Sequence, residues 1–288
     1  MPQAQAQTQA HAAPRQDLRA PLTFIRKQAT KPQFKSAALT GGEPEVTFEL
    51  ERHEVDIHDM RQVADRLTLD DTGFELRRMP TAVADLYDDA AIAQAYEPEV
   101  IALLKAHTGA DDVVVFDHTR RSDAATGASN PDGARGPASR VHVDYTVASG
   151  PQRARDVLGD AAVTRVLDAG GRIMQVNVWR PIRGPVRRAP LALAAAKSVP
   201  FDSLVATDQL FADRTGEIYH LAYDARQEWF YAPEMTPEEV ILIKGWDSLD
   251  DGRARFTPHG AVVLDRPDES LPPRESIETR TYLVFAPD

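Results

Sequence analysis

The sequence contains no cysteine among its 288 residues. This absence excludes a disulfide framework, a thiolate nucleophile and an iron–sulfur cluster. The sequence also lacks any apolar stretch near the ~20 residues that span a bilayer, so no membrane partner is expected. Acidic residues outnumber basic ones, with 44 Asp and Glu against 33 Lys and Arg. The formal net charge of -11 argues against nucleic acid or anionic lipid as a partner, because both carry phosphates. We expect a protein of the reducing cytoplasm.

What remains is the composition of an ordinary folded chain, with 42% hydrophobic and 27% charged residues. The first segment, from Met1 to about Arg19, is rich in Gln, Ala and Thr and has no apolar core of a secretory signal. We therefore expect a disordered tail over residues 1–19. Residues 20–288 are expected to form a single domain, since no internal repeat and no second boundary is visible.

Short runs of β-branched and aromatic residues, separated by Gly and Pro turns, recur along the chain. Strands are expected at 45–50, 112–117, 141–146, 173–179, 217–223, 229–231, 240–243, 259–264 and 276–285. Helices are expected at 82–107 with a new start at Pro98, at 151–158 and at 160–167, and a helix or turn at 59–67. This order indicates a mainly β fold with flanking helices. We favour a double-stranded β-helix, the cupin-like jelly roll.

A long polar segment, residues 119–139, follows the strand expected at 112–117 and ends just before His142. It contains Arg, Ser, Gly, Pro and Asn and almost no large apolar residue. A loop of this length inside a compact domain is often functional. We expect a lid over an active site.

His142, Val143 and Asp144 form a His-X-Asp tripeptide, and His259 follows far downstream after Thr-Pro. Alternate residues of a strand point to one side, so His142 and Asp144 are expected to project together. Two imidazoles and one carboxylate leave open positions on a metal ion, as in non-haem Fe(II) oxygenases. Zinc hydrolases use a similar set, so the ligands alone leave the metal open. A single such tripeptide is also common in strands that bind no metal.

Arginines downstream of His259 help to separate these alternatives. Arg274 and Ser276 share one face of an extended chain, and Arg280 has the same parity. A guanidinium with a hydroxyl is suited to gripping the far carboxylate of a 2-oxo acid. A metal-dependent hydrolase or lyase on the same barrel needs no such grip. The alternative role for these arginines is pairing with nearby acidic residues.

Other residues near these motifs are weaker candidates. Asn177 and Trp179 share a strand face, Tyr145 follows the tripeptide, and Arg121 lies at the lid, so each is a candidate for substrate contact. Thr146 has the parity of the aspartate and is a candidate for contact with the 2-oxo acid. Each also has a structural alternative, such as a buried amide bonded to backbone or a solvated loop charge.

Several blocks of the sequence resemble the CmcJ/AsaB-type family of oxygenases from natural-product pathways. The blocks are Arg-Val-His-Val-Asp-Tyr-Thr (140–146), Asn-Val-Trp-Arg-Pro-Ile (177–182), Phe-Thr-Pro-His (256–259) and Arg-Glu-Ser-Ile-Glu-Thr-Arg (274–280). Segments 116–121 and 235–240, with Lys244, also fit. The resemblance runs from about residue 46 to residue 285, which is nearly the whole chain.

The resemblance implies a double-stranded β-helix with His142, Asp144 and His259 as ligands of Fe(II). It also implies that 2-oxoglutarate and O2 are consumed as co-substrates, with Arg274 and Ser276 as the first candidates for the 2-oxoglutarate anchor. The presence of Asp144 speaks against a halogenase, which leaves that coordination position to chloride.

We therefore expect an Fe(II)/2-oxoglutarate-dependent dioxygenase that oxidises a C–H bond of a small molecule by hydroxylation, desaturation or a related rearrangement. The sequence permits a homodimer. The alternatives are a metal-dependent hydrolase or lyase on the same barrel and a metal-free binding protein, although all three ligands are intact. A methyltransferase is disfavoured, because no Gly-rich strand–turn–helix is present.

Overall fold

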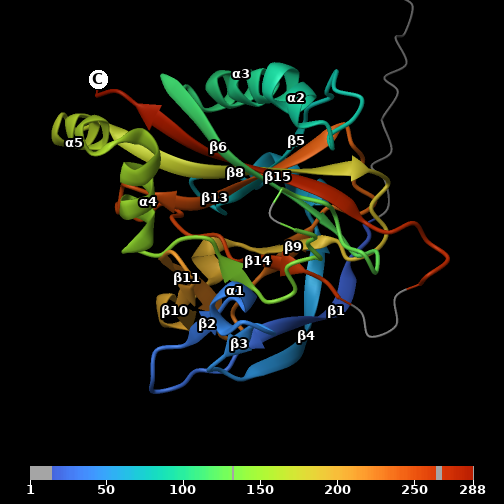
Figure 1. Ribbon diagram of the computed structural model, residues 1–288. Coiled ribbons are helices and arrows are strands. Elements are labelled where there is room, and N and C mark those ends of the chain that lie inside the picture. Colours follow the sequence, from blue (N-terminus) through green and yellow to red (C-terminus); the bar gives the residue numbers. More distant parts are fainter. Residues whose placement is uncertain (1–14, 132, 264–267, 288) are drawn as a thin grey trace, which may run out of the picture.

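A computed structural model describes residues 15–131, 133–263 and 268–287 (Figure 1). The last two residues of the tail expected over residues 1–19 belong to a strand instead. Strand β1, Leu18–Ile25, takes in the last two of those residues, because it pairs antiparallel with strand β4, Leu50–Asp59. The rest of the expected tail, residues 1–14, lies outside the described residues.

Two sheets make up most of the structure, and the fold is mainly β as expected. The smaller sheet has the order β5-β13-β8-β15-β6, with all neighbours antiparallel. Its strands are β5 (Phe74–Arg78), β13 (Glu239–Asp247), β8 (Arg172–Arg183), β15 (Glu275–Phe285) and β6 (Asp112–Ser122).

The larger sheet has the order β1-β4-β12-β9-β14-β7-β11-β10-β2-β3 and lies below the smaller one in Figure 1. Besides β1 and β4, its strands are β12 (Trp229–Tyr231), β9 (Leu191–Ala194), β14 (His259–Ala261), β7 (His142–Val143), β11 (Thr215–Leu221), β10 (Leu204–Leu210), β2 (Gln33–Lys35) and β3 (Glu45–Val46). The prediction of a strand with a buried face at 45–50 was wrong. Both residues of β3 are exposed, and the chain bends before β4 begins.

Helices flank the sheets rather than filling the space between them (Figure 1). They are α1 (Ala37–Thr40), η1 (Met60–Arg66), α2 (Asp89–Ala91), η2 (Ile92–Tyr96), α3 (Glu97–Thr108), α4 (Ser149–Leu158), α5 (Asp160–Asp168), η3 (Ala196–Ser198) and η4 (Phe201–Ser203). Pro98 lies in the first turn of α3, which continues directly from η2 because Tyr96 and Glu97 both have helical backbone angles. The helical region begins at Asp89 rather than at residue 82, because the Asp88 carboxylate caps the amides of Ala90 and Ala91. Within the described residues, no helix has both the length and the apolar character needed to cross a membrane.

The outer face of the smaller sheet packs against α3. Met174, Val176 and Val178 of β8 form one buried cluster with Val100 and Leu104 of that helix. Because side chains alternate along a strand, the intervening β8 residues point to the other side of the sheet, toward the larger sheet.

The inner faces of the two sheets enclose a second part of the core. Trp179 of β8 shares a buried cluster with Leu193 of β9, and Tyr282 of β15 shares another with Val143 of β7. The inward residues of β8 and β15 therefore face the strands that carry the His-X-Asp tripeptide and the distal histidine.

Candidate metal centre

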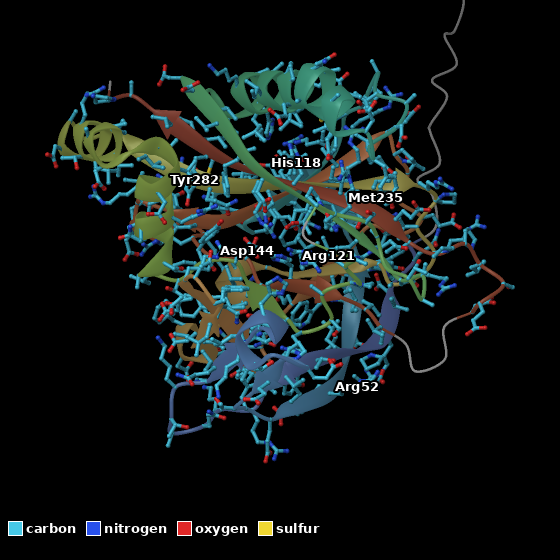
Figure 2. The ribbon with its side chains drawn as sticks, in the orientation of Figure 1. Arg52, His118, Arg121, Asp144, Met235 and Tyr282 are labelled. Atoms are coloured by element: carbon cyan, nitrogen blue, oxygen red, sulfur yellow. The ribbon has the colours of Figure 1, made fainter. Side chains whose placement is uncertain are left out.

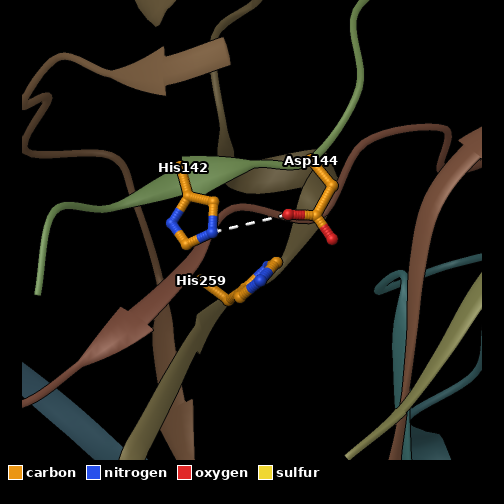
Figure 3. Close-up of side chains that lie close together, drawn as sticks. All are labelled: His142, Asp144 and His259. Atoms are coloured by element: carbon orange, nitrogen blue, oxygen red, sulfur yellow. Dashed lines mark ion pairs between the residues drawn. The ribbon is translucent and has the colours of Figure 1, made fainter. Parts of the chain in front are cut away.

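The three expected metal ligands meet at one point between the sheets (Figure 3). His142 on β7 and His259 on β14 are direct partners in the antiparallel register, and their ring centroids lie 4.6 Å apart. Asp144 follows β7, and its Oδ1 lies 3.5 Å from the Nε2 of His142. One ligand atom from each residue lies within 4.8 Å of the others, so the group could hold a metal ion.

Hydrogen bonds to the backbone orient both imidazoles. The Nδ1 of His142 lies 2.8 Å from the carbonyl of Arg140, and the Nδ1 of His259 lies 3.0 Å from the carbonyl of Thr257. A carbonyl can only accept, so each Nδ1 carries the proton and each Nε2 keeps its lone pair. Burial, together with the neighbouring His142, lowers the pKa of His259 and keeps that ring neutral. This donor set fits a divalent metal ion.

The carboxylate of Asp144 is fixed from its other side. Its Oδ2 accepts hydrogen bonds from the Nδ2 of Asn177, at 2.8 Å, and from the Nε of Arg280, at 3.3 Å. Burial acts to raise the pKa of Asp144, but the charge of Arg280, together with the hydrogen bond and charge of His142 and the charge of His259, holds that pKa well below its ordinary range. Asp144 is therefore ionised, with Oδ2 held by protein donors and Oδ1 directed toward His142.

Arg280 was one of the expected contacts of a 2-oxo acid, but each of its nitrogens donates within the protein. Besides Asp144, its partners are the Asp117 carboxylate at 2.5 Å, the Thr119 hydroxyl at 3.0 Å and the Glu278 carboxylate at 2.8 Å. The structure thus brings Arg280 to the carboxylate of the metal-ligand group rather than leaving its fork open to a small molecule.

Arg274 differs from Arg280 in having donors to spare. Its side chain is only 2% exposed, and its Nη1 donates to the carbonyl of Ala189 at 2.7 Å. Its Nε is buried without any hydrogen-bond partner. Burial and the nearby charge of Arg121 lower the pKa of Arg274 to about 10, so the guanidinium remains charged at neutral pH. A buried, charged and partly unsatisfied guanidinium is suited to an anionic ligand.

A small cavity connects Arg274 to the two imidazoles. Its lining includes Arg121, His142, Trp179, His259 and Arg274, and its volume is about 20 Å³. That volume is close to the space of a single water molecule. Ala138, from the segment expected to form a lid, also lines it. We call it the small cavity below.

The other candidate residues differ in whether they line the small cavity. Ser276 is buried and is the register partner of Arg121, so it lies beside the arginine pair. Asn177 contacts Asp144 as described, and Trp179 and Arg121 line the small cavity. In Figure 2, Arg121 and Asp144 lie in the space between the two sheets.

Tyr145 and Thr146 point elsewhere. Tyr145 packs in the buried cluster that contains Trp246 and Tyr282, and it is absent from the lining of the small cavity. The Thr146 hydroxyl accepts from the backbone amides of Ala148 and Ser149, at 3.1 and 3.0 Å, and so caps the turn into α4. Its hydroxyl is thus occupied by the start of a helix.

Residues that support the site were missed in the sequence. Gln175 donates to the Oδ1 of Asn177 at 2.5 Å and thereby orients the amide that holds Asp144. The alternation of Gln175, Asn177 and Trp179 along one strand was the available signal, because polar residues at every second position of a buried strand point into one site.

Known proteins resemble this chain over most of its length. A family model described as "Oxidoreductase/YMDC permease-like domain" matches residues 22–285. The hydroxylase/desaturase efuI of Hormonema carpetanum is 32% identical over 253 residues, covering 81% of this chain and 83% of that protein. The Fe(II)/2-oxoglutarate-dependent dioxygenase nvfI of Aspergillus novofumigatus is 31% identical over 252 residues, covering 85% of this chain and 87% of that protein.

A solved structure is also similar to this chain over most of its length. The iron and alpha-ketoglutarate-dependent endoperoxidase NvfI aligns with a TM-score of 0.81 at 27% identity, covering 94% of this chain and 99% of that chain.

Proposed function

The chain belongs to the family of hydroxylases and desaturases that depend on Fe(II) and 2-oxoglutarate, and from that premise we propose how its residues hold the two groups. It is an oxidoreductase of that class, and its substrate is a small molecule of secondary metabolism. We propose that the two facing sheets are the halves of a double-stranded β-helix. The mostly antiparallel pairing of the strands and the cluster of candidate ligands between the sheets support this assignment.

His142, Asp144 and His259 hold the iron in this proposal. Both imidazoles present an unprotonated Nε2, and Asp144 presents Oδ1 while Asn177 and Arg280 retain its Oδ2. A carboxylate held in this way supplies one oxygen rather than two, which leaves the remaining positions of the metal open. When bound there, Fe(II) with 2-oxoglutarate and O2 supplies the oxidising power that removes hydrogen from a substrate C–H bond.

Arg274 and Ser276 bind the far carboxylate of 2-oxoglutarate. The observation that carries this proposal is the buried Nε of Arg274, which lacks a partner in the same small cavity that both imidazoles line. A carboxylate placed there satisfies the guanidinium fork and is oriented for the other end of the molecule to reach the metal. A hydrolase has no use for a second anion site in that position.

The lid residues regulate access to this site. The small cavity is too small for a five-carbon dicarboxylate, so the lid segment that carries Ala138 moves aside for 2-oxoglutarate. The Nη1 of Arg121 donates to the carbonyl of Gly136 at 2.9 Å and holds that segment in place.

Anaerobic titration with Fe(II) and 2-oxoglutarate tests this assignment, because bidentate chelation gives a visible charge-transfer band. We expect the band for the wild type and no band for His142→Ala, which removes a ligand. Arg274→Ala is expected to bind the metal normally but to need ~100-fold more 2-oxoglutarate, since loss of a buried charge partner costs about 2–5 kcal/mol.

Arg226→Ala is the matched control, because Arg226 is exposed and pairs only with Asp224 among the partners described. It should leave the titration unchanged. An Arg274→Ala protein that binds 2-oxoglutarate as tightly as the wild type contradicts the anchor. A His142→Ala protein with an undiminished band contradicts the metal site.

A further inference from the structure

A second cavity, about 780 Å³ in volume, lies next to the small one, and the residues proposed to hold iron and 2-oxoglutarate do not line it. Its walls are lid residues 122–127, loop residues 186–190 between β8 and β9, and the side chains of Tyr231, Val262 and Leu271. We call it the large cavity. Its volume is in the range of pockets that enclose a drug-sized molecule.

Shared backbone segments separate the two cavities. Leu191 and Ala261 line the small cavity, whereas their neighbours Pro190 and Val262 line the large one. Backbone hydrogen bonds join these segments, from Val262 to the Pro190 carbonyl at 2.9 Å and from Ala261 to the carbonyl of the lid residue Ala138 at 2.8 Å. The wall between the cavities is therefore one backbone layer thick.

Both arginines of the small cavity are bonded to that wall. Arg121 donates to Gly136, and Arg274 donates to Ala189, and both carbonyl residues line the large cavity. Ala189 has a φ of 43°, an unusual value for a residue with a side chain. Both arginines of the small cavity are therefore anchored on the wall that it shares with the large cavity.

The charges that line the large cavity are already neutralised. Arg188 pairs with Asp123 at 2.9 Å with both side chains 13% exposed, and Arg187 pairs with Glu234 at 2.8 Å. Asp268, on the exposed rim, accepts a hydrogen bond from the Ser270 amide. A charged ligand would lose its hydration there without gaining an unpaired partner from the described lining.

We propose that the large cavity is the substrate chamber of this enzyme and that it takes a neutral, largely apolar molecule. The substrate lies against the lid and loop 186–190 and reaches the metal ligands where the wall at Gly136–Ala138 gives way. This inference rests on the proposed function, because it identifies the ligand of the chamber as the substrate of the iron site.

The charge and location of the ligand are tested with a matched pair of fluorescent probes, neutral dansylamide and the anionic dansylglycine. We expect dansylamide to bind the full-length protein and dansylglycine to bind at least ~10-fold more weakly, which corresponds to about 1.4 kcal/mol. Ala124→Trp, which fills the large cavity, should weaken dansylamide binding by at least ~10-fold.

Ala148→Trp is the control, because Ala148 is exposed and lines neither cavity. It should bind dansylamide as the wild type does. Circular dichroism shows whether each variant is folded. Equal dansylamide affinity in folded Ala124→Trp and wild type, or tighter binding of dansylglycine, overturns the proposal.

Co(II) alone tests whether the chamber adjoins the metal site, because this ion quenches nearby dansyl fluorescence. Co(II) should quench bound dansylamide in the wild type and not in His142→Ala. Co(II) that shows its own absorption bands in the protein without quenching the probe contradicts the chamber. Failure of Co(II) to bind contradicts the metal site instead, while dansylamide binding still reports on the cavity.

Discussion

Two clusters of buried charge in this protein differ in how completely their polar groups are used. At Lys244, the ammonium group is fully buried and donates to Asp70 at 2.6 Å, to Asp247 at 2.9 Å and to the carbonyl of Ala254 at 2.9 Å. An ammonium has three donors, so nothing is left for a ligand. Arg172 gives Asp247 a second cation.

Near the candidate metal ligands, by contrast, some polar groups have no hydrogen-bond partner among the described residues. One ligand atom from each of His142, Asp144 and His259 is available to a metal ion, and the Nε of Arg274 is buried without a partner in a residue that lines the small cavity with both imidazoles. Both clusters are buried and charged, so burial and charge alone do not mark a functional site. The unused donors and acceptors mark it, because leaving them unpaired costs stability that only a ligand restores.

The largest expected effect is on the satisfied cluster. Lys244→Met leaves Asp247 buried with one cation fewer, and we expect the free energy of unfolding to fall by about 3–5 kcal/mol. Urea denaturation measures this change. Lys197→Met, at an exposed pair with Asp71, is the control and should change stability by less than ~1 kcal/mol. If Lys244→Met is as stable as the wild type, the hydrogen-bonded cluster at Lys244 does not stabilise the fold.

Asn177→Ala tests the support of the metal ligand. Without the amide, Asp144 loses a donor that fixes Oδ2, and we expect metal affinity to fall by about 10–100-fold. Isothermal titration with Fe(II) under anaerobic conditions gives the affinity. Gln152→Ala, which removes an exposed amide bonded to Asp156, should leave it unchanged. An unchanged affinity in Asn177→Ala means that Arg280 alone is sufficient.

Thr146→Ala separates a helix cap from a contact with 2-oxoglutarate. Because the hydroxyl accepts from the amides of Ala148 and Ser149 at the start of α4, we expect a loss of ~1 kcal/mol in unfolding free energy. Thr146→Ser retains the hydroxyl and should recover most of this loss. The charge-transfer titration should be the same for all three proteins. If Thr146→Ala binds 2-oxoglutarate more weakly but is as stable as the wild type, then Thr146 contacts 2-oxoglutarate as the sequence suggested.

The smallest expected effect on stability is at the unsatisfied arginine. Arg274→Met removes a buried charge and an unpaired Nε but leaves the Ala189 carbonyl without its donor. These contributions oppose each other, so we expect the unfolding free energy to change by less than ~1 kcal/mol. Thermal and urea unfolding of Arg274→Met and Lys244→Met, measured together, give the contrast directly. A loss as large as that of Lys244→Met would show that Arg274 serves mainly the fold.

The sequence predicted most strands of the smaller sheet but missed several strands of the larger one. The segment expected at 229–231 coincides with β12, and buried runs of β-branched residues led to β6, β8, β13 and β15. Strand β1 was missed because it contains Pro21, which only an edge strand such as β1 accommodates. Strand β9 was missed because Leu-Ala-Leu-Ala has the composition of a helix, and complete burial between β12 and β14 outweighs that propensity.

The site could be predicted where it depended on alternation and not where it depended on pairing between distant segments. Alternation placed His142 beside Asp144 and Arg274 beside Ser276. The sequence did not show which of Arg274 and Arg280 keeps an unpaired donor. Arg280 is held by one carboxylate from β6 and one that follows β7, and these come together only in the folded sheets. The turn that diverts Thr146 into a helix cap was also invisible, since strand β7 ends at Val143.

The direct pairing of His142 with His259 also determines when the proposed metal site can form during synthesis. Strand β7 emerges from the ribosome long before β14, and β14 lies between β9 and β7 in the sheet. A nascent chain that ends before residue 259 carries two ligands and lacks the third. The proposed metal site is therefore complete only after nearly all of the chain has been translated.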